Sequence, residues 1–80
     1  MTINEPIAVD CVFKNPGMEP RYFKWRNRSY RIMKINGRWH RRQGKFMIYC
    51  FAVSDEHNNA YELELDTEEM KWQLLKIDEE

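Results

Sequence analysis

The sequence predicts an all-β protein, a five- or six-stranded antiparallel meander curled into a small SH3-like barrel. The first observation is the run 46–53, FMIYCFAV, which holds eight apolar residues and no charge, Gly or Pro. A short run rich in aromatic and β-branched residues is typical of a strand. Because successive strand side chains point to opposite faces, both faces of this strand are apolar. We therefore expect it to be the central strand, covered on both sides.

The second observation is the alternation of apolar and polar residues, which begins upstream of this run. Residues 7–14 alternate as in a half-buried strand. Asn15-Pro16-Gly17 is a strong turn signal, and 21–26 and 29–35 then form a predicted hairpin whose turn uses the tolerance of Asn27 for left-handed geometry. The alternation breaks at Ile32-Met33, where a β-bulge would restore it and bend the strand.

The third observation is that all three glycines lie at candidate turns. Asn36-Gly37 is a favoured type I′ turn signal, so 39–42 is predicted as a short arm or connector before the central strand. After it, 54–59 is a polar loop and 60–65 alternates cleanly as a further strand.

The last segment, 66–77, has two interpretations. Asp66 followed by Glu69 resembles a helix N-cap signature, and Met70, Leu74 and Ile77 have helical spacing. Against this, Met70, Trp72 and Leu74 also alternate, and a polar link after 60–65 suits a hairpin. The strand is favoured, and a helix from about residue 67, giving an α+β fold, is the alternative.

Length and composition indicate one small domain over residues 1–80, with 1–5 and 79–80 frayed. A chain of 80 residues buries a modest core, and the 14% aromatic content compensates for its size. The predicted core residues are Val9, Cys11, Phe13, Phe23, Trp25, Tyr30, Ile32, Trp39, Ile48, Phe51, Tyr61, Leu63, Leu65, Trp72 and Leu74.

The two cysteines, Cys11 and Cys50, lie far apart among apolar neighbours and indicate free thiols rather than a disulfide framework. No export signal and no long apolar run is present, so we expect a cytoplasmic protein. Four scattered His and Cys residues do not form a zinc pattern, and no Gly-rich phosphate loop occurs, so no metal and no cofactor is expected.

The charges are balanced in number but not in position. Thirteen basic and thirteen acidic residues give a net charge of zero, yet residues 21–45 hold ten Lys and Arg and no acid. Residues 55–80 hold most of the acids. Such asymmetry indicates either a polyanionic partner or charge pairing between strands.

The pattern Pro20-x-x-Phe23-x-Trp25-Arg26-x-Arg28-x-Tyr30-x-Ile32, with Trp39, Tyr61-Glu62-Leu63 and Trp72-x-Leu74, resembles a family of small bacterial all-β proteins of unknown function. Members of that family resemble accessory proteins found near translesion DNA polymerase genes. The resemblance covers about residues 20–78 and implies a C-terminal hairpin and a connection with DNA. This chain departs from the family by having Asn27 where the family has Gly, and by its sharply basic middle.

Two functional hypotheses follow, and neither is enzymatic, because no acid, base and nucleophile converge. In the first, a basic and aromatic face binds single-stranded nucleic acid, with cations on the phosphates and an exposed ring stacked on a base. Its predicted residues are Tyr22, Lys24, Arg26, Arg28, Arg31, Arg41 and Arg42. In the second, the protein binds another protein or itself as a homodimer, and Glu62, Glu64 and the acidic tail neutralise the cations.

Overall fold

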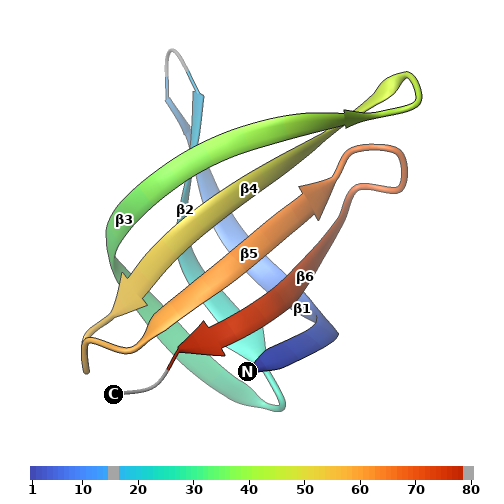
Figure 1. The fold of residues 1–80 in the computed structure, drawn as a ribbon. Helices are drawn as coiled ribbons and strands as arrows, with labels where there is room; N and C mark the ends of the chain where they lie inside the picture. Colours follow the sequence, from blue (N-terminus) through green and yellow to red (C-terminus); the bar gives the residue numbers. More distant parts are fainter. Residues whose placement is uncertain (15–16, 79–80) are drawn as a thin grey trace.

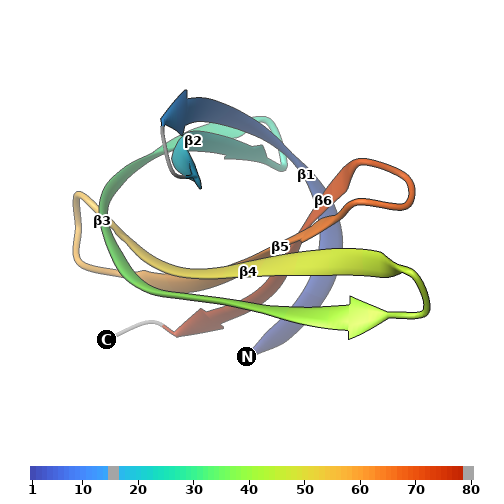
Figure 2. The same cartoon turned by 90° about the horizontal axis from the view of Figure 1, so that it is seen from above.

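A computed structural model describes residues 1–14 and 17–78, and these residues form six strands and no helix. The strands are β1 (Thr2–Lys14), β2 (Gly17–Trp25), β3 (Arg28–Gln43), β4 (Phe46–Asp55), β5 (Ala60–Asp66) and β6 (Lys71–Asp78). Each strand pairs antiparallel with the next, and β6 pairs with β1 to close a barrel (Figures 1 and 2). The predicted antiparallel barrel is confirmed. The alternative C-terminal helix is wrong, because the segment after residue 70 pairs with β5.

The core lies inside the barrel, on one face of the central strand β4. Phe51 and Val53 pack there against Leu63 and Leu74, and the last three of these are fully buried. On the opposite face of β4, Ile48 and Cys50 are also buried, at 2% and 1% exposure. Their register partners on β3 are Arg41 and Trp39, so side chains of the same chain cover the second face.

Two predicted core residues are exposed, and these predictions are wrong. Phe13 is 77% exposed because it lies near the end of β1, in a hairpin arm that projects beyond the barrel. Trp39 is 43% exposed because it lies on the outer side of β3, opposite Cys50. It covers that outer face instead of filling the interior.

The β2–β3 turn follows the prediction. Arg26 and Asn27 have positive φ angles of 51° and 62°, as a two-residue hairpin loop requires, and Asn tolerates this geometry better than most residues. The predicted bulge is confirmed by the register shift between Ile32 and Lys34.

The predicted turn at Asn36-Gly37 is wrong. These residues continue β3, which carries a second register shift between Ile35 and Gly37. Consequently the predicted arm 39–42 belongs to the same 16-residue strand, which pairs first with β2 and then with β4. Pairing with β4 provides more hydrogen bonds than a local turn could, which explains why the turn signal is overridden.

The amino-terminal residues, which we expected to be frayed, pair with β6 from Thr2 onward. The Met1 amino group donates a hydrogen bond to the Ile77 carbonyl at 2.8 Å, and the Ile77 amide donates to the Met1 carbonyl at 3.0 Å. The predicted turn residues Asn15 and Pro16 and the predicted frayed end 79–80 lie outside the described residues. None of the described residues forms a helix that could cross a bilayer.

The seam between β2 and β3 is incomplete. Their pairing extends only from Trp25 and Arg28 to Tyr22 and Arg31, after which β3 turns to pair with β4. The first half of β2 instead pairs with the end of β1. Consequently the β1–β2 hairpin and the β3–β4 hairpin separate at one end of the barrel (Figure 1). The surface between them is the site described below.

Candidate nucleic-acid interface

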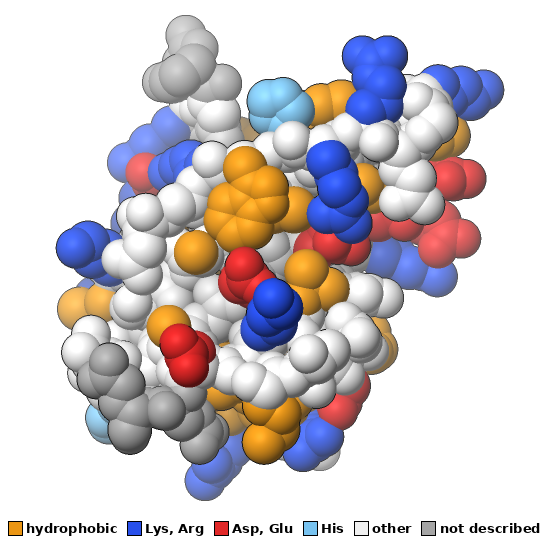
Figure 3. Space-filling model, in the orientation of Figure 1, with side chains coloured by type: hydrophobic (Ala, Val, Ile, Leu, Met, Phe, Trp, Pro, Cys, Tyr) orange, Lys and Arg blue, Asp and Glu red, His pale blue; other side chains and the backbone are white. Residues whose placement is uncertain are grey.

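The structure does not bring the seven predicted nucleic-acid-binding residues together on one face. Tyr22, Lys24 and Arg31 share the outer face of β2 and β3, since Tyr22 lies directly opposite Arg31. The other four are distributed along the chain: Arg26 in the β2–β3 turn, Arg28 at the start of β3, and Arg41 and Arg42 near its end. Figure 3 shows Lys and Arg side chains at the edges of one face and also in its middle, where acids lie beside them.

Arg26 is held by an acid from β1. Its Nε donates to Glu5 Oε1 at 3.1 Å, its Nη2 contacts the other carboxylate oxygen, and its guanidinium lies 4.6 Å from the centre of the Trp25 ring. Trp25 Nε1 also donates to Glu5, at 3.0 Å. The hydrogen bonds from Arg26 and Trp25 lower the pKa of Glu5, and those to Glu5 raise the pKa of Arg26. Arg26 is therefore largely neutralised.

Arg41 is held by an acid from β5. Its Nη2 donates to Glu64 at 2.9 Å and its Nη1 lies 3.4 Å from Cys50 Sγ. The hydrogen bond to Glu64 raises the pKa of Arg41. Of the two acids expected to neutralise the basic segment, Glu64 does so, whereas Glu62 forms its ion pair with Lys76 of β6 at 3.6 Å.

The other predicted cations remain open. Within residues 1–14 and 17–78, no carboxylate oxygen lies within 4.0 Å of Lys24, Arg28, Arg31 or Arg42. All four side chains are exposed. With Tyr22 at 45% exposure, Lys24 and Arg31 form a strip on the outer surface that carries a ring and two free charges.

A groove lies at the open end of the barrel and is here called the mouth groove. It has a volume of about 620 Å³ and lies between the β1–β2 and β3–β4 hairpins. One wall consists of Phe13, Lys14 and Met18, and the other of Arg38, Trp39 and His40. Tyr49 and Phe51 of β4 contribute to its floor.

The register between β3 and β4 shows on which side of β3 its basic residues lie. Arg38 lies opposite Phe51, His40 opposite Tyr49 and Arg42 opposite Met47. Because Phe51 belongs to the core, this row lies on the side of β3 that faces the barrel interior and continues past its open end. Arg38 spans the groove, since its guanidinium lies 5.8 Å from the Phe51 ring centre and Nη1 donates to the Met18 carbonyl at 2.6 Å. The mouth groove therefore combines aromatic rings with fixed positive charge.

Sequence reasoning missed Phe13, Lys14, Arg38 and Trp39 as site residues. Alternation assigned both rings to the core, and the turn signal at Asn36-Gly37 placed Arg38 and Trp39 beyond the end of a strand. Alternation offered no signal that Trp39 is exposed, because its neighbours Arg38 and His40 point to the opposite face of the strand whichever side Trp39 occupies.

Other chemistry finds little support in the described part of the chain. It contains no group of three or more His, Cys, Asp or Glu side chains that could hold a metal ion. Cys11 and Cys50 are free, and burial raises the pKa of both thiols, which keeps them protonated and weakly nucleophilic. Asp55 is buried but accepts hydrogen bonds from Tyr61 and Asn59, which gives it a structural role.

Comparison of the chain with family models, with curated proteins and with solved structures finds no match. The resemblance to the bacterial family stays a prediction from the sequence, and the site is interpreted below from its own geometry.

Proposed function

We propose that the protein is a non-enzymatic accessory module that binds single-stranded nucleic acid in the mouth groove. The observation that carries the proposal is the mouth groove itself, where the exposed ring of Phe13 and the charges of Lys14 and Arg38 line one hollow, with the exposed Trp39 at the edge of its β3 wall. Sequence-independent binding of a single strand uses this combination, because every base offers a π-face and every nucleotide a phosphate.

Exposed rings of this size need an explanation in a small protein. The interior already contains a packed aromatic cluster in which Phe23 stacks on Tyr30 at 4.8 Å and meets the edge of Tyr61 at 5.0 Å. Phe13 lies outside it and is 77% exposed, and Trp39, which covers the outer face of the sheet, still leaves 43% of its surface exposed, so both offer apolar surface to a ligand. Stacking of a base on such a ring stabilises a complex by about 1–3 kcal/mol.

The free cations extend the surface on which a phosphate backbone would lie. Arg42 continues the row of Arg38 and His40 along β3, and the outer strip of Tyr22, Lys24 and Arg31 offers a second contact area. Arg28 lies at the start of the same strand. Arg26 and Arg41 contribute less to this surface, since each already forms an ion pair.

Fluorescence anisotropy with a labelled thymidine oligonucleotide, at two salt concentrations, tests the proposal. Counterion release predicts that log K falls with log salt by about 0.7 for each phosphate neutralised on a single strand. We expect Trp39→Ala and Phe13→Ala to weaken binding by about 5- to 150-fold, the equivalent of one lost base stack. Tyr22→Ala tests the outer strip in the same way.

Met70→Ala is the matched control, because Met70 is 65% exposed in the β5–β6 turn and lines no part of the mouth groove. It should bind as the unmodified protein does. Absence of binding to any oligonucleotide at low salt, with the fold intact by circular dichroism, would overturn the proposal.

One observation favours a second function, binding of another protein or of a second copy. Aromatic residues, Met and Arg are enriched at protein interfaces, and Phe13, Met18, Trp39 and Arg38 all line the mouth groove. Sedimentation at micromolar concentration distinguishes the two. A monomer that binds oligonucleotides supports the first function, whereas a dimer dissociated by Phe13→Ala supports the second.

The compartment that suits this function is the cytoplasm, where nucleic acid is available and thiols stay reduced. The two free cysteines support this location. Fractionation of the producing cells would test it.

A further inference from the structure

A second groove lies between the diverging parts of β2 and β3, and it is here called the seam groove. It has a volume of about 460 Å³, and its apolar base is formed by Pro20, Ile32 and Ile35. Four cations line it: Lys14, Arg21, Lys34 and Arg38. Lys14 and Arg38 also line the mouth groove, so the two grooves adjoin at these side chains.

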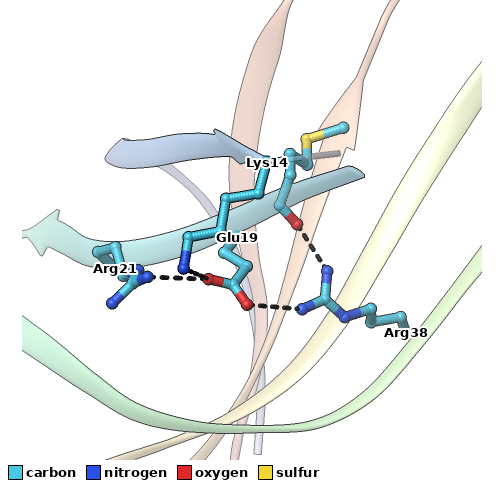
Figure 4. A network of polar contacts seen from close by, with 5 residues as sticks. Lys14, Glu19, Arg21 and Arg38 are labelled. Carbon is cyan, nitrogen blue, oxygen red and sulfur yellow. Dashed lines mark hydrogen bonds and ion pairs between the residues drawn. The ribbon is translucent and has the colours of Figure 1, made fainter. Parts of the chain in front are cut away.

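A single carboxylate holds three of these cations in place (Figure 4). Glu19 Oε2 lies 2.9 Å from Arg21 Nη2 and 3.6 Å from Lys14 Nζ, and Oε1 lies 3.5 Å from Arg38 Nη2. These residues come from three strands, β1, β2 and β3. Glu19 thus positions the cations before any ligand arrives, which lowers the entropy that binding would lose.

The cluster has more charge and more donors than Glu19 uses. Four cations and one carboxylate leave three positive charges around one groove. A guanidinium has five N–H donors and an ammonium three. Among the described residues, Arg21 forms an ion pair through one nitrogen only, and no carboxylate lies within 4.0 Å of Lys34. These free donors point to a ligand with several anionic oxygens.

The seam groove adjoins the mouth groove at Lys14 and Arg38, and it ends where β2 pairs with β3. Backbone pairing of β2 with β3 begins at Tyr22 and Arg31, so a strand that enters from the mouth groove cannot continue between these strands. A diester in the middle of a nucleic acid carries one negative charge, whereas a terminal phosphate monoester carries about 1.5 to 2 at pH 7 and three acceptor oxygens. A short groove that ends at the paired strands and carries three net positive charges fits the terminal group better.

We propose that the seam groove binds the terminal phosphate of a nucleic acid strand whose bases lie in the mouth groove. This proposal rests on the proposed function. Arg21 and Lys34 contact the phosphate, Arg38 lies between it and the first base, and Glu19 keeps the cations in position. The protein then acts on strand ends in preference to strand interiors.

The experiment compares oligonucleotides of one sequence with a 5′-phosphate, a 3′-phosphate or hydroxyl groups at both ends, in competition anisotropy at pH 7.5. We expect one phosphorylated form to bind at least tenfold more tightly than the hydroxyl form. Lys34→Met should abolish this preference and leave the affinity for the hydroxyl form within about twofold. Lys24→Met removes an equally open charge outside the groove and should keep the preference.

Three outcomes separate this proposal from the proposed function. Equal affinity for all three oligonucleotides overturns the terminal-phosphate site and leaves the proposed function standing. No binding of any of them overturns both. Binding of a phosphoserine peptide without binding of oligonucleotides also overturns both and identifies a protein ligand.

Discussion

At the scale of single residues, Asp55 is the most constrained polar group in the described part of the molecule. It is 6% exposed and accepts hydrogen bonds from Tyr61 Oη at 2.7 Å and from the His57 and Asn59 amides at 2.9 Å each. Burial raises its pKa, but these hydrogen bonds outweigh burial and the pKa is lowered overall. Burial, followed by the bond to Asp55, raises the pKa of Tyr61. Asp55 thus fixes the β4–β5 turn to the barrel.

Replacement of Asp55 by Asn should destabilise the protein by about 2–3 kcal/mol, because an amide cannot accept all these hydrogen bonds and its own donors are left buried. Urea unfolding at pH 7 measures this loss. Asp10→Asn, at an exposed position of β1, should have no such effect.

The stability that Asp55 provides also depends on pH. Its folded-state pKa is lowered, so this contribution is complete above the unfolded-state pKa of about 4 and is lost as pH falls from there through the folded value. We expect the difference in unfolding free energy between the protein and Asp55→Asn to shrink below pH 4. A difference that stays constant from pH 7 to pH 2 would contradict this assignment.

At the scale of elements, the turns determine how the strands fit together. Among the turns that the structure describes, only the β3–β4 turn needs a glycine. Gly44, in the β3–β4 turn, has a φ of +62°, which other L-residues adopt at a cost. Gly17 starts β2 without a positive φ, and a Cβ at either position meets nothing within 4 Å. The two positions therefore differ in backbone geometry, but each has free space for a side chain.

Gly44→Ala should destabilise the protein by about 1 kcal/mol through backbone strain alone. Gly17→Ala should leave the stability unchanged or raise it slightly, since it restricts the unfolded chain without strain. The midpoints of urea unfolding compare the stability of the two variants with that of the unmodified protein. An unchanged midpoint for Gly44→Ala would contradict this prediction and show that the β3–β4 turn tolerates a side chain.

The strands could be predicted from the sequence because alternation is a local property. The bulge at Ile32-Met33 was predictable for the same reason, since a broken alternation within one strand is visible in the residues themselves. The turn at Asn36-Gly37 was not predictable, because whether it forms depends on pairing between β3 and β4. The preference of one dipeptide for a turn does not outweigh the backbone hydrogen bonds of a long antiparallel pair of strands.

At the scale of the whole molecule, acids from three different strands lie against the basic segment. Glu5 of β1 reaches Arg26, Glu64 of β5 reaches Arg41, and Glu19 joins three strands. The composition indicated a basic segment, but which of its cations remain free depends on strand register. The candidate site was therefore only partly predictable. Arg42 was expected, but Phe13 was assigned to the interior although its hairpin arm extends beyond the barrel, and Trp39 was assigned to the interior although it lies on the outer side of β3.

The closed barrel depends on one small interior, so the loss of a central side chain affects the whole fold. Leu63 is fully buried in β5, opposite Phe51 and Leu74. Leu63→Ala should destabilise the protein by about 2–5 kcal/mol, out of a total of about 5–15 kcal/mol for a domain. Thermal unfolding measures the effect. Leu75→Ala, at a half-buried position of β6, should be milder, and a reversed order would contradict the described core.

The hydrogen bonds between Met1 and Ile77 bring the two ends of the described chain together, opposite the tips of the β1–β2 and β3–β4 hairpins (Figure 1). A short Gly/Ser peptide could therefore join them covalently, and new ends could be opened in the β5–β6 turn. Such a cyclised or circularly permuted protein would keep both grooves intact, and a fluorophore attached at the joint would report on ligands without touching them.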